Sequence, residues 1–228
     1  MDNEKVLGTN RRDIAAAVAR GTLGAIPVVG SAVAEAVSAF IPGQKLERVT
    51  AFVEELSRNL QSLSEKQAIL EERLRTPEGS DLLEEGILQA SRAISPERRR
   101  RIANIVTAGM VDRDLKYDRT KKLLDILGSL TDSELLLLTY YAKTPTFGSS
   151  HHNHLQQEYP DVLRPVSREI GAPQAEVERG AFRDSYERTL IGYGLLDRSE
   201  RGTGITALGR LLLKAAGDDG VGSVAPAP

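Results

Sequence analysis

The 228-residue sequence contains no cysteine, which excludes disulfide bonds, thiolate metal sites and cysteine nucleophiles. It also lacks an excess of positive charge, because 30 Lys and Arg face 32 Asp and Glu and the formal net charge is −2. A protein that neutralises many phosphates needs a broad basic surface, which this composition does not favour. Because a reducing compartment fits a chain without cysteine, we expect a cytoplasmic protein. The apolar segment described next adds the alternative that this protein lies at the periphery of the inner membrane.

The sequence has no run of about 20 strongly apolar residues, which a transmembrane helix needs. The most apolar segment, "GTLGAIPVVGSAVAEAVSAF" at 21–40, consists largely of Ala, Gly and Val and contains Pro27 and Glu35. Acidic residues before it and the missing A-x-A site after it argue against a secretory signal. The position of Pro27 instead predicts a helical hairpin, with helices over about 12–25 and 27–40.

This hairpin has two open interpretations, a packed core element or a contact element for a membrane or a partner. Gly30, Ala34 and Ser38 are four residues apart, so the second helix has a stripe that allows close backbone approach. The same segment also supplies apolar side chains that a membrane or partner could contact. These candidate contact residues are Ile26, Val28, Val29, Val33, Val37 and Phe40.

The next segment has the clearest helical pattern in the chain. Its apolar residues alternate in steps of three and four from Leu46 to Leu74, with the polar Gln67 as the exception. This spacing is typical of a helix whose apolar seam faces another helix. No Gly or Pro interrupts 44–76, so we predict one helix of roughly 45–50 Å. Packing within the chain is the preferred interpretation, and a dimer is the alternative.

Further helices are expected up to residue 130. A turn is predicted over 76–81 and a helix over 81–94. Ser95 and Pro96 are suited to the N-cap and first position of the following helix, which carries the basic run 98–101. Four consecutive arginines cannot share one helix face, so salt bridges or solvation are preferred for them over contact with lipid or nucleic acid.

The segment after residue 130 is predicted to form a second domain. Thr131 and Glu134 have the spacing of a capping box that opens a helix, and the segment 144–154 is predicted as a loop. A short helical stretch ends at Gly171, and a long helix follows over 174–194. Two short strands are then expected at 195–198 and 205–207, followed by a closing helix.

This order of a long helix, a two-stranded wing and a closing helix resembles a winged helix, and "GLL…ITALGRLLL" is similar to many bacterial winged-helix domains. DNA binding would need basic phosphate contacts, but residues 155–216 carry as many acidic side chains as basic ones. A wing that contacts protein or is purely structural is therefore preferred. The candidate nucleic-acid contacts are Arg183, Arg198 and Arg201.

No catalytic motif was found in the sequence. The glycine-rich segment "GTLGAIPVVG" has neither P-loop nor dinucleotide spacing, and no nucleophile lies in a motif with a base. The histidines His151, His152 and His154 could bind a metal with Glu158 or Asp161. A solvated polar loop is the preferred interpretation of the three histidines. We therefore expect a protein that is not an enzyme and that has no cofactor and no metal site.

Several segments together support a wider resemblance. They are "IPGQKLERVTAFVEELSRNL", "EGILQASRAISPERRRRIANIV", "LGSLTDSELLLL" and "YGLLDRS…ITALGRLL", in this order. This order resembles uncharacterised bacterial helical proteins of the abortive-infection alpha type, from which the sequence departs in its histidine-containing loop. The resemblance implies a role in defence against phage through membrane or protein contacts.

The predicted fold class is mostly α, with a helical hairpin and long-helix bundle followed by a winged-helix-like domain. The expected divisions are a flexible segment 1–11, the helical region 12–130, the winged-helix-like domain 131–216 and a disordered tail 217–228. The preferred function is that of a non-enzymatic defence or stress protein that binds a protein partner, itself or a membrane surface. The alternative is a winged-helix DNA-binding regulator whose N-terminal region oligomerises.

Overall fold

A computed structural model of the protein describes residues 45–61, 72–112, 115–143, 150–167, 171–199 and 202–218. The predicted hairpin with Ile26, Val28, Val29, Val33, Val37 and Phe40 lies outside the described residues, as do Arg201, the segment 1–11 and the part of the expected tail from 219 onward. The chain divides into two compact units, residues 1–128 and 129–228. In the described residues the structure is mostly helical, as predicted.

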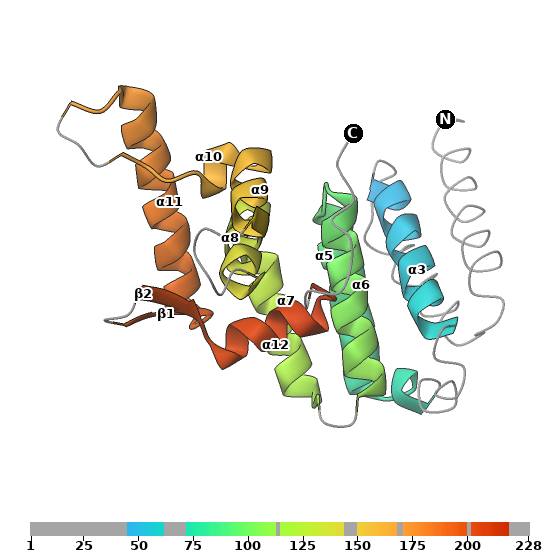
Figure 1. Ribbon diagram of the computed structural model, residues 1–228. Helices are drawn as coiled ribbons and strands as arrows, with labels where there is room; N and C mark the ends of the chain where they lie inside the picture. Colours follow the sequence, from blue (N-terminus) through green and yellow to red (C-terminus); the bar gives the residue numbers. More distant parts are fainter. Residues whose placement is uncertain are drawn as a thin grey trace, which may run out of the picture. The chain divides into compact units, whose positions relative to one another are not determined.

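The first unit is built from helices that pack side by side (Figure 1). The helix α3 contacts both α5 and α6, and α5 also contacts α6. The chain then turns into α7, which ends at the boundary of the unit. The described helices are α3 (Leu46–Gln61), α5 (Pro77–Arg92), α6 (Pro96–Val111) and α7 (Tyr117–Ser129).

The predicted apolar seam forms the buried face of α3. Val49, Val53, Leu56 and Leu60 are all at most 5% exposed, and Phe52 beside them is fully buried. Because α3 packs on α5 and α6, the described part of the seam faces the interior of its own chain. The residues 62–71, with the polar seam residue Gln67, lie outside the described part, so a single continuous helix over 44–76 stays a prediction.

Local capping chemistry sets where α5 and α6 begin. Ser95 accepts a hydrogen bond from the backbone N–H of Arg98 at 3.2 Å, which confirms the predicted N-cap. The predicted turn over 76–81 is wrong, because Thr76 caps α5 and the helix begins at Pro77. A Cβ at Gly79 would collide with the carbonyl of Arg73, so glycine permits this close approach.

The second unit combines helices with one β-hairpin. The helix α8 contacts α10, α11, β2 and α12, and the strands β1 and β2 pair antiparallel (Figure 1). Its elements are α8 (Asp132–Lys143), α9 (Ser150–Glu158), α10 (Pro160–Leu163), α11 (Gln174–Gly192), β1 (Leu196–Ser199), β2 (Gly202–Ile205) and α12 (Ala207–Ala215).

The predicted capping box at the start of α8 is confirmed. The backbone N–H of Thr131 donates to the Glu134 carboxylate at 2.6 Å, and the N–H of Glu134 donates to the Thr131 hydroxyl at 3.2 Å. These reciprocal bonds satisfy two donors that a helix start leaves without an intrahelical partner.

Two boundaries in this unit differ from the sequence expectation. The loop predicted over 144–154 is wrong in its second half, because α9 begins at Ser150. The second strand ends at Ile205 instead of beginning there, because Thr206 caps α12 through the N–H of Gly209 at 3.0 Å. Thr is a favoured N-cap residue, so Thr206 indicated that a helix begins at Ala207. The strand prediction over 205–207 did not take this signal into account. The resemblance of this unit to a winged helix stays a prediction.

Candidate functional site

The carboxylate of Glu187 on α11 is a point where three elements of the second unit meet. It accepts a hydrogen bond from the Tyr141 hydroxyl of α8 at 2.8 Å. Its oxygens lie 3.7 Å from the Arg183 Nε of α11 and 4.0 Å from a terminal nitrogen of Arg198 on β1. The Glu187 side chain is only 13% exposed, so this cluster, which we call the Glu187 cluster, joins α8, α11 and the β-hairpin.

The environment of Tyr141 keeps its hydroxyl protonated. Burial raises the pKa of Tyr141 to about 12, and the hydrogen bond to Glu187 with the charge of that carboxylate acts in the same direction. A tyrosine that serves as a general base would need a lowered pKa near the working pH. The Tyr141 hydroxyl therefore acts as a hydrogen-bond donor that holds α8 against α11.

Two arginines of α11 bind the carbonyl groups at the end of α10. The guanidinium of Arg183 donates to the carbonyls of Val162 and Leu163 at 3.2 and 2.9 Å. Arg179 donates to the carbonyls of Pro160, Arg164 and Pro165 at 3.0–3.1 Å. It also pairs with Glu176 at 2.6 Å, and this hydrogen bond lowers the pKa of the Glu176 carboxyl. Cations at carbonyls that a helix end leaves free stabilise that end.

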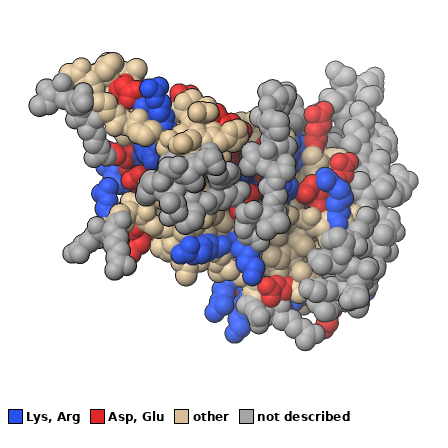
Figure 2. Space-filling view, in the orientation of Figure 1, with Lys and Arg blue, Asp and Glu red and all other residues tan. Residues whose placement is uncertain are grey.

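The structure brings two of the three candidate nucleic-acid contacts together. Arg183 and Arg198 share the Glu187 carboxylate, while Arg201 lies outside the described residues. Arg183 is only 18% exposed and is held by the fold, whereas the Arg198 side chain is 68% exposed. On the face drawn in Figure 2, the Lys and Arg side chains form small separate groups among acidic and uncharged residues.

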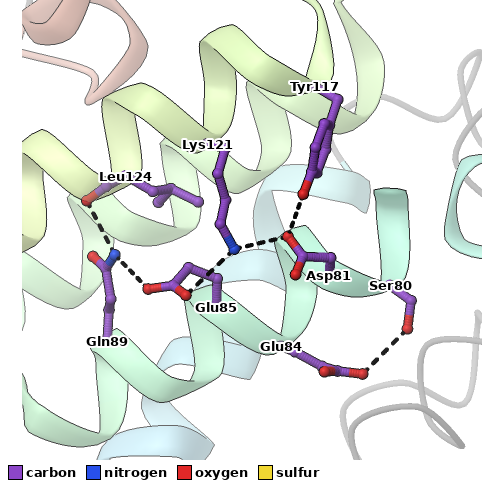
Figure 3. A network of polar contacts seen from close by, with 8 residues as sticks. All are labelled: Ser80, Asp81, Glu84, Glu85, Gln89, Tyr117, Lys121 and Leu124. Atoms are coloured by element: carbon purple, nitrogen blue, oxygen red, sulfur yellow. Dashed lines mark hydrogen bonds and ion pairs between the residues drawn. The ribbon is translucent and has the colours of Figure 1, made fainter. Parts of the chain in front are cut away.

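A second polar cluster lies in the first unit, between α5 and α7 (Figure 3). Lys121 Nζ lies 2.8 Å from the carboxylate of Asp81 and 3.5 Å from that of Glu85. The Tyr117 hydroxyl donates to the same Asp81 oxygen at 2.8 Å. Gln89 continues the cluster by donating its amide to Glu85 at 2.8 Å and to the Leu124 carbonyl at 3.0 Å.

The pKa shifts in this cluster stabilise its charged pair. The hydrogen bond from Lys121 lowers the pKa of Asp81 despite the opposing effect of burial. Burial disfavours the charged form of Lys121, but the hydrogen bond and the charges of Asp81 and Glu85 outweigh it and raise the pKa of Lys121. The hydrogen bond to Asp81 also raises the pKa of Tyr117. Lysine and tyrosine held protonated in this way act as a clamp between two helices, not as a base or a nucleophile.

The basic run 98–101 is bound in part to the protein itself. Arg98 donates to the carbonyl of Leu127 at 2.9 Å, and Arg99 donates to the carbonyls of Ala93 and Ile94 at 3.1 and 3.0 Å. These carbonyls lie at the ends of α7 and α5, where cations are favourable. Arg98 and Arg99 thus bind backbone carbonyls of their own chain, a kind of contact that the expectation of salt bridges or solvation did not include.

The structure places the histidines on α9. The backbones of His151 and His152 belong to that helix. His154 Nε2 lies 3.8 Å from Oε2 of Glu158, one turn later on the helix. Among the residues whose side chains are described, no group of three metal-ligating side chains comes together. In the same part of the chain, no helix has the length and apolar character needed to cross a membrane.

The comparisons with known proteins give no relative, since neither a protein-family model nor a curated protein nor a solved structure matches the chain.

Sequence reasoning found Arg183 and Arg198 but missed the carboxylate and the phenol that organise them. The spacing of Arg183 and Glu187, four residues apart on one helix, is a signal that could have identified that pair. No local signal connects Tyr141 to Glu187, because the two residues are 46 positions apart.

Proposed function

We propose that the protein is a non-enzymatic bacterial defence or stress protein that acts through protein or membrane contacts. The contact element in this proposal is the apolar hairpin expected within 12–42. The resemblance of the segment order to abortive-infection alpha-type proteins supports the defence role. The structural roles of the polar clusters around Glu187 and Lys121 support action through contacts, because their titratable groups are used to join elements of the fold.

One observation favours protein or membrane contact over DNA binding: arginines of α11 bind groups of the chain itself. Arg179 and Arg183 bind backbone carbonyls, and Glu187 lies beside both Arg183 and Arg198. A DNA-binding helix instead directs its cations to phosphates, which supply most of the nonspecific affinity. Releasing Arg183 for a phosphate would leave the partly buried carbonyls of Val162 and Leu163 without this donor, which costs free energy.

A phage challenge tests the proposed function. Bacteria that express the chain should support fewer plaques than bacteria that carry the vector, and the Val33→Asp variant should lose this protection because a charge disfavours contact with an apolar surface. The exposed-position variant Glu54→Lys is the matched control and should protect as well as the parent chain. Equal plaque numbers with the parent chain and the vector, across a broad set of phages, would contradict the defence role.

The alternative function is a winged-helix DNA-binding regulator. It is favoured by the order of α8, α11, the β-hairpin and α12, and by the exposed Arg198 on the first strand of the hairpin. Retention of the intact protein on heparin that weakens steeply with salt, together with an Arg198-dependent duplex sequence from a selection experiment, would establish this alternative. Under the preferred function, the protein selects no tight duplex sequence at physiological salt.

A further inference from the structure

A polar hollow of about 410 Å³ lies along α9 and the end of α10. This volume falls within the range of small-ligand sites. Side chains that carry amides dominate its wall, and one guanidinium lies at the end of α10. The residues that line the hollow are Asn153, Gln156, Gln157, Pro160 and Arg164.

The frame of this hollow is fixed by hydrogen bonds from neighbouring elements. The amide of Gln156 donates to the hydroxyl of Tyr140 at 3.0 Å, and Tyr140 is only 2% exposed. Arg179 donates to the carbonyls of Pro160 and Arg164, so it holds the backbone on both sides of α10. A backbone held in this way loses little conformational freedom when the hollow binds a ligand, so the ordering cost falls on the exposed side chains.

Three lining side chains keep their hydrogen-bonding capacity. Asn153, Gln157 and Arg164 are exposed, and their side chains make no hydrogen bond or ion pair within the described part of the chain. The charge of Arg164 does reach the Glu176 carboxyl, whose pKa is lowered mainly by its hydrogen bond from Arg179 and to a smaller extent by Arg164. Arg164 differs in this respect from Arg179 and Arg183, which bind carbonyls of α10 and the residues after it. The hollow therefore presents one guanidinium with free hydrogen-bond donors beside two amides that can both donate and accept.

The chemistry of these groups indicates the class of ligand. A guanidinium binds a carboxylate or phosphate through parallel hydrogen bonds, and primary amides match the donors and acceptors of peptide groups. The exposed carboxylates of Glu158 and Asp161 belong to the same two helices. They disfavour a polyanion such as nucleic acid, but they tolerate a peptide with a single carboxylate paired to Arg164.

We propose that this hollow binds a peptide segment of a partner protein through a carboxylate on that segment. Arg164 pairs with the carboxylate, and the amides of Asn153 and Gln157 pair with backbone groups of the peptide. The carboxylate is supplied either by an Asp or Glu side chain or by the C-terminus of the partner. This inference rests on the proposed function and deepens it by naming a class of partner, and the residues that it uses lie outside 12–42.

Synthetic peptide libraries on beads test the inference with the full-length protein. One library has free C-termini and the other has amidated C-termini, so enrichment in one or both identifies the source of the carboxylate. Enriched peptides are then measured by fluorescence polarisation. We expect the Arg164→Gln variant to weaken binding at least about tenfold, and Arg164→Lys to retain part of the affinity because it keeps the charge but loses the parallel bonds.

The matched control is Arg188→Gln, which removes an exposed arginine of α11 that does not line the hollow. It should bind the peptides as tightly as the parent protein, and thermal melts should show that all variants fold. The inference is overturned if no peptide is enriched, if the enriched peptides lack a carboxylate, or if Arg164→Gln binds them unchanged. It is also overturned if a single-stranded oligonucleotide binds through Arg164 more tightly than any peptide.

The phage challenge separates this inference from the proposed function. If no peptide binds but the parent chain still protects bacteria, the inference is overturned and the defence role stands. Arg164-dependent peptide binding without any protection would support the inference and contradict the defence role.

Discussion

Lys121 Nζ lies 2.8 Å from the carboxylate of Asp81, and this pair connects α7 to α5 across 40 positions of sequence. Tyr117 donates to the same carboxylate from one turn earlier on α7, so Asp81 receives two donors from one helix (Figure 3). The side chain of Lys121 is 28% exposed and that of Asp81 is 44% exposed. Solvent therefore screens the pair, and its contribution to stability is modest.

The first prediction concerns the coupling between these two charges. A double-mutant cycle with Asp81→Asn and Lys121→Met should give a coupling free energy of about 0.5 kcal/mol, as is usual for partly exposed ion pairs. Urea unfolding at pH 7 measures it. Because folding lowers the pKa of Asp81, its contribution is present above the ordinary pKa of an aspartate and is lost as the pH falls through the lowered value. A coupling that is unchanged in acid strong enough to protonate Asp81 would show that Asp81 does not supply it. Lys122→Met, on the exposed side of α7, is the control and should have almost no effect.

The second prediction concerns the buried face of α3. Val53→Asp should destabilise the fold by more than about 3 kcal/mol, because it places an unpaired charge where the side chain is fully buried. Leu60→Asp should act in the same direction. The neighbouring change Glu54→Lys lies on the exposed face and should leave the melting temperature nearly unchanged. Indistinguishable thermal unfolding of the buried and exposed variants would refute the assignment of this face.

The third prediction concerns the close approach of α6 and α7. A Cβ at Gly109 would overlap the side chain of Thr120, which is fully buried. Gly109→Ala should therefore destabilise the protein by about 1–3 kcal/mol through overpacking. At Gly192 on α11, a Cβ would meet no atom within 4 Å, so Gly192→Ala should be neutral or slightly stabilising. Differential scanning calorimetry measures the melting temperature of both variants. A Gly109→Ala variant as stable as the parent protein would contradict the close contact with Thr120.

The fourth prediction concerns the ionisation of Tyr141. Glu187→Gln removes the negative charge that adds to burial in raising the pKa of Tyr141 to about 12, so the pKa should fall towards the ordinary value. NMR titration of the tyrosine Cζ resonances measures this change. Because the folded pKa is raised, the contribution of Tyr141 to stability is present below its unfolded pKa and is lost as the pH rises through about 12. An unaltered titration in the variant would mean that burial alone sets the pKa.

A control for the Glu187 cluster is the nearby acidic residue Asp184. It lies on α11 and is exposed, so Asp184→Asn should leave the titration of Tyr141 as it is in the parent protein.

Features that depend on neighbours along the chain were determined by the sequence itself. The Ser95 cap and the Thr131–Glu134 capping box are local features. In each, the hydroxyl that accepts the hydrogen bond and the backbone N–H that donates it lie within one helical turn. The buried face of α3 was likewise predictable, because helical geometry converts the spacing of Val49, Val53 and Leu56 into one continuous apolar side. The mostly helical class follows from the same local rules.

The tertiary structure alone decided which distant charges meet. Tyr141 joins Glu187 and Lys121 joins Asp81 only because packing places their helices together, and no periodicity encodes such pairs. It also decided which arginines bind backbone carbonyls. The sequence alone does not distinguish Arg164 from Arg179 and Arg183. The carbonyls at the end of α10 lie within reach of Arg179 and Arg183, whereas the Arg164 side chain lines the open hollow. An unpaired carbonyl attracts the nearest donor, and which donor is nearest depends on the three-dimensional fold.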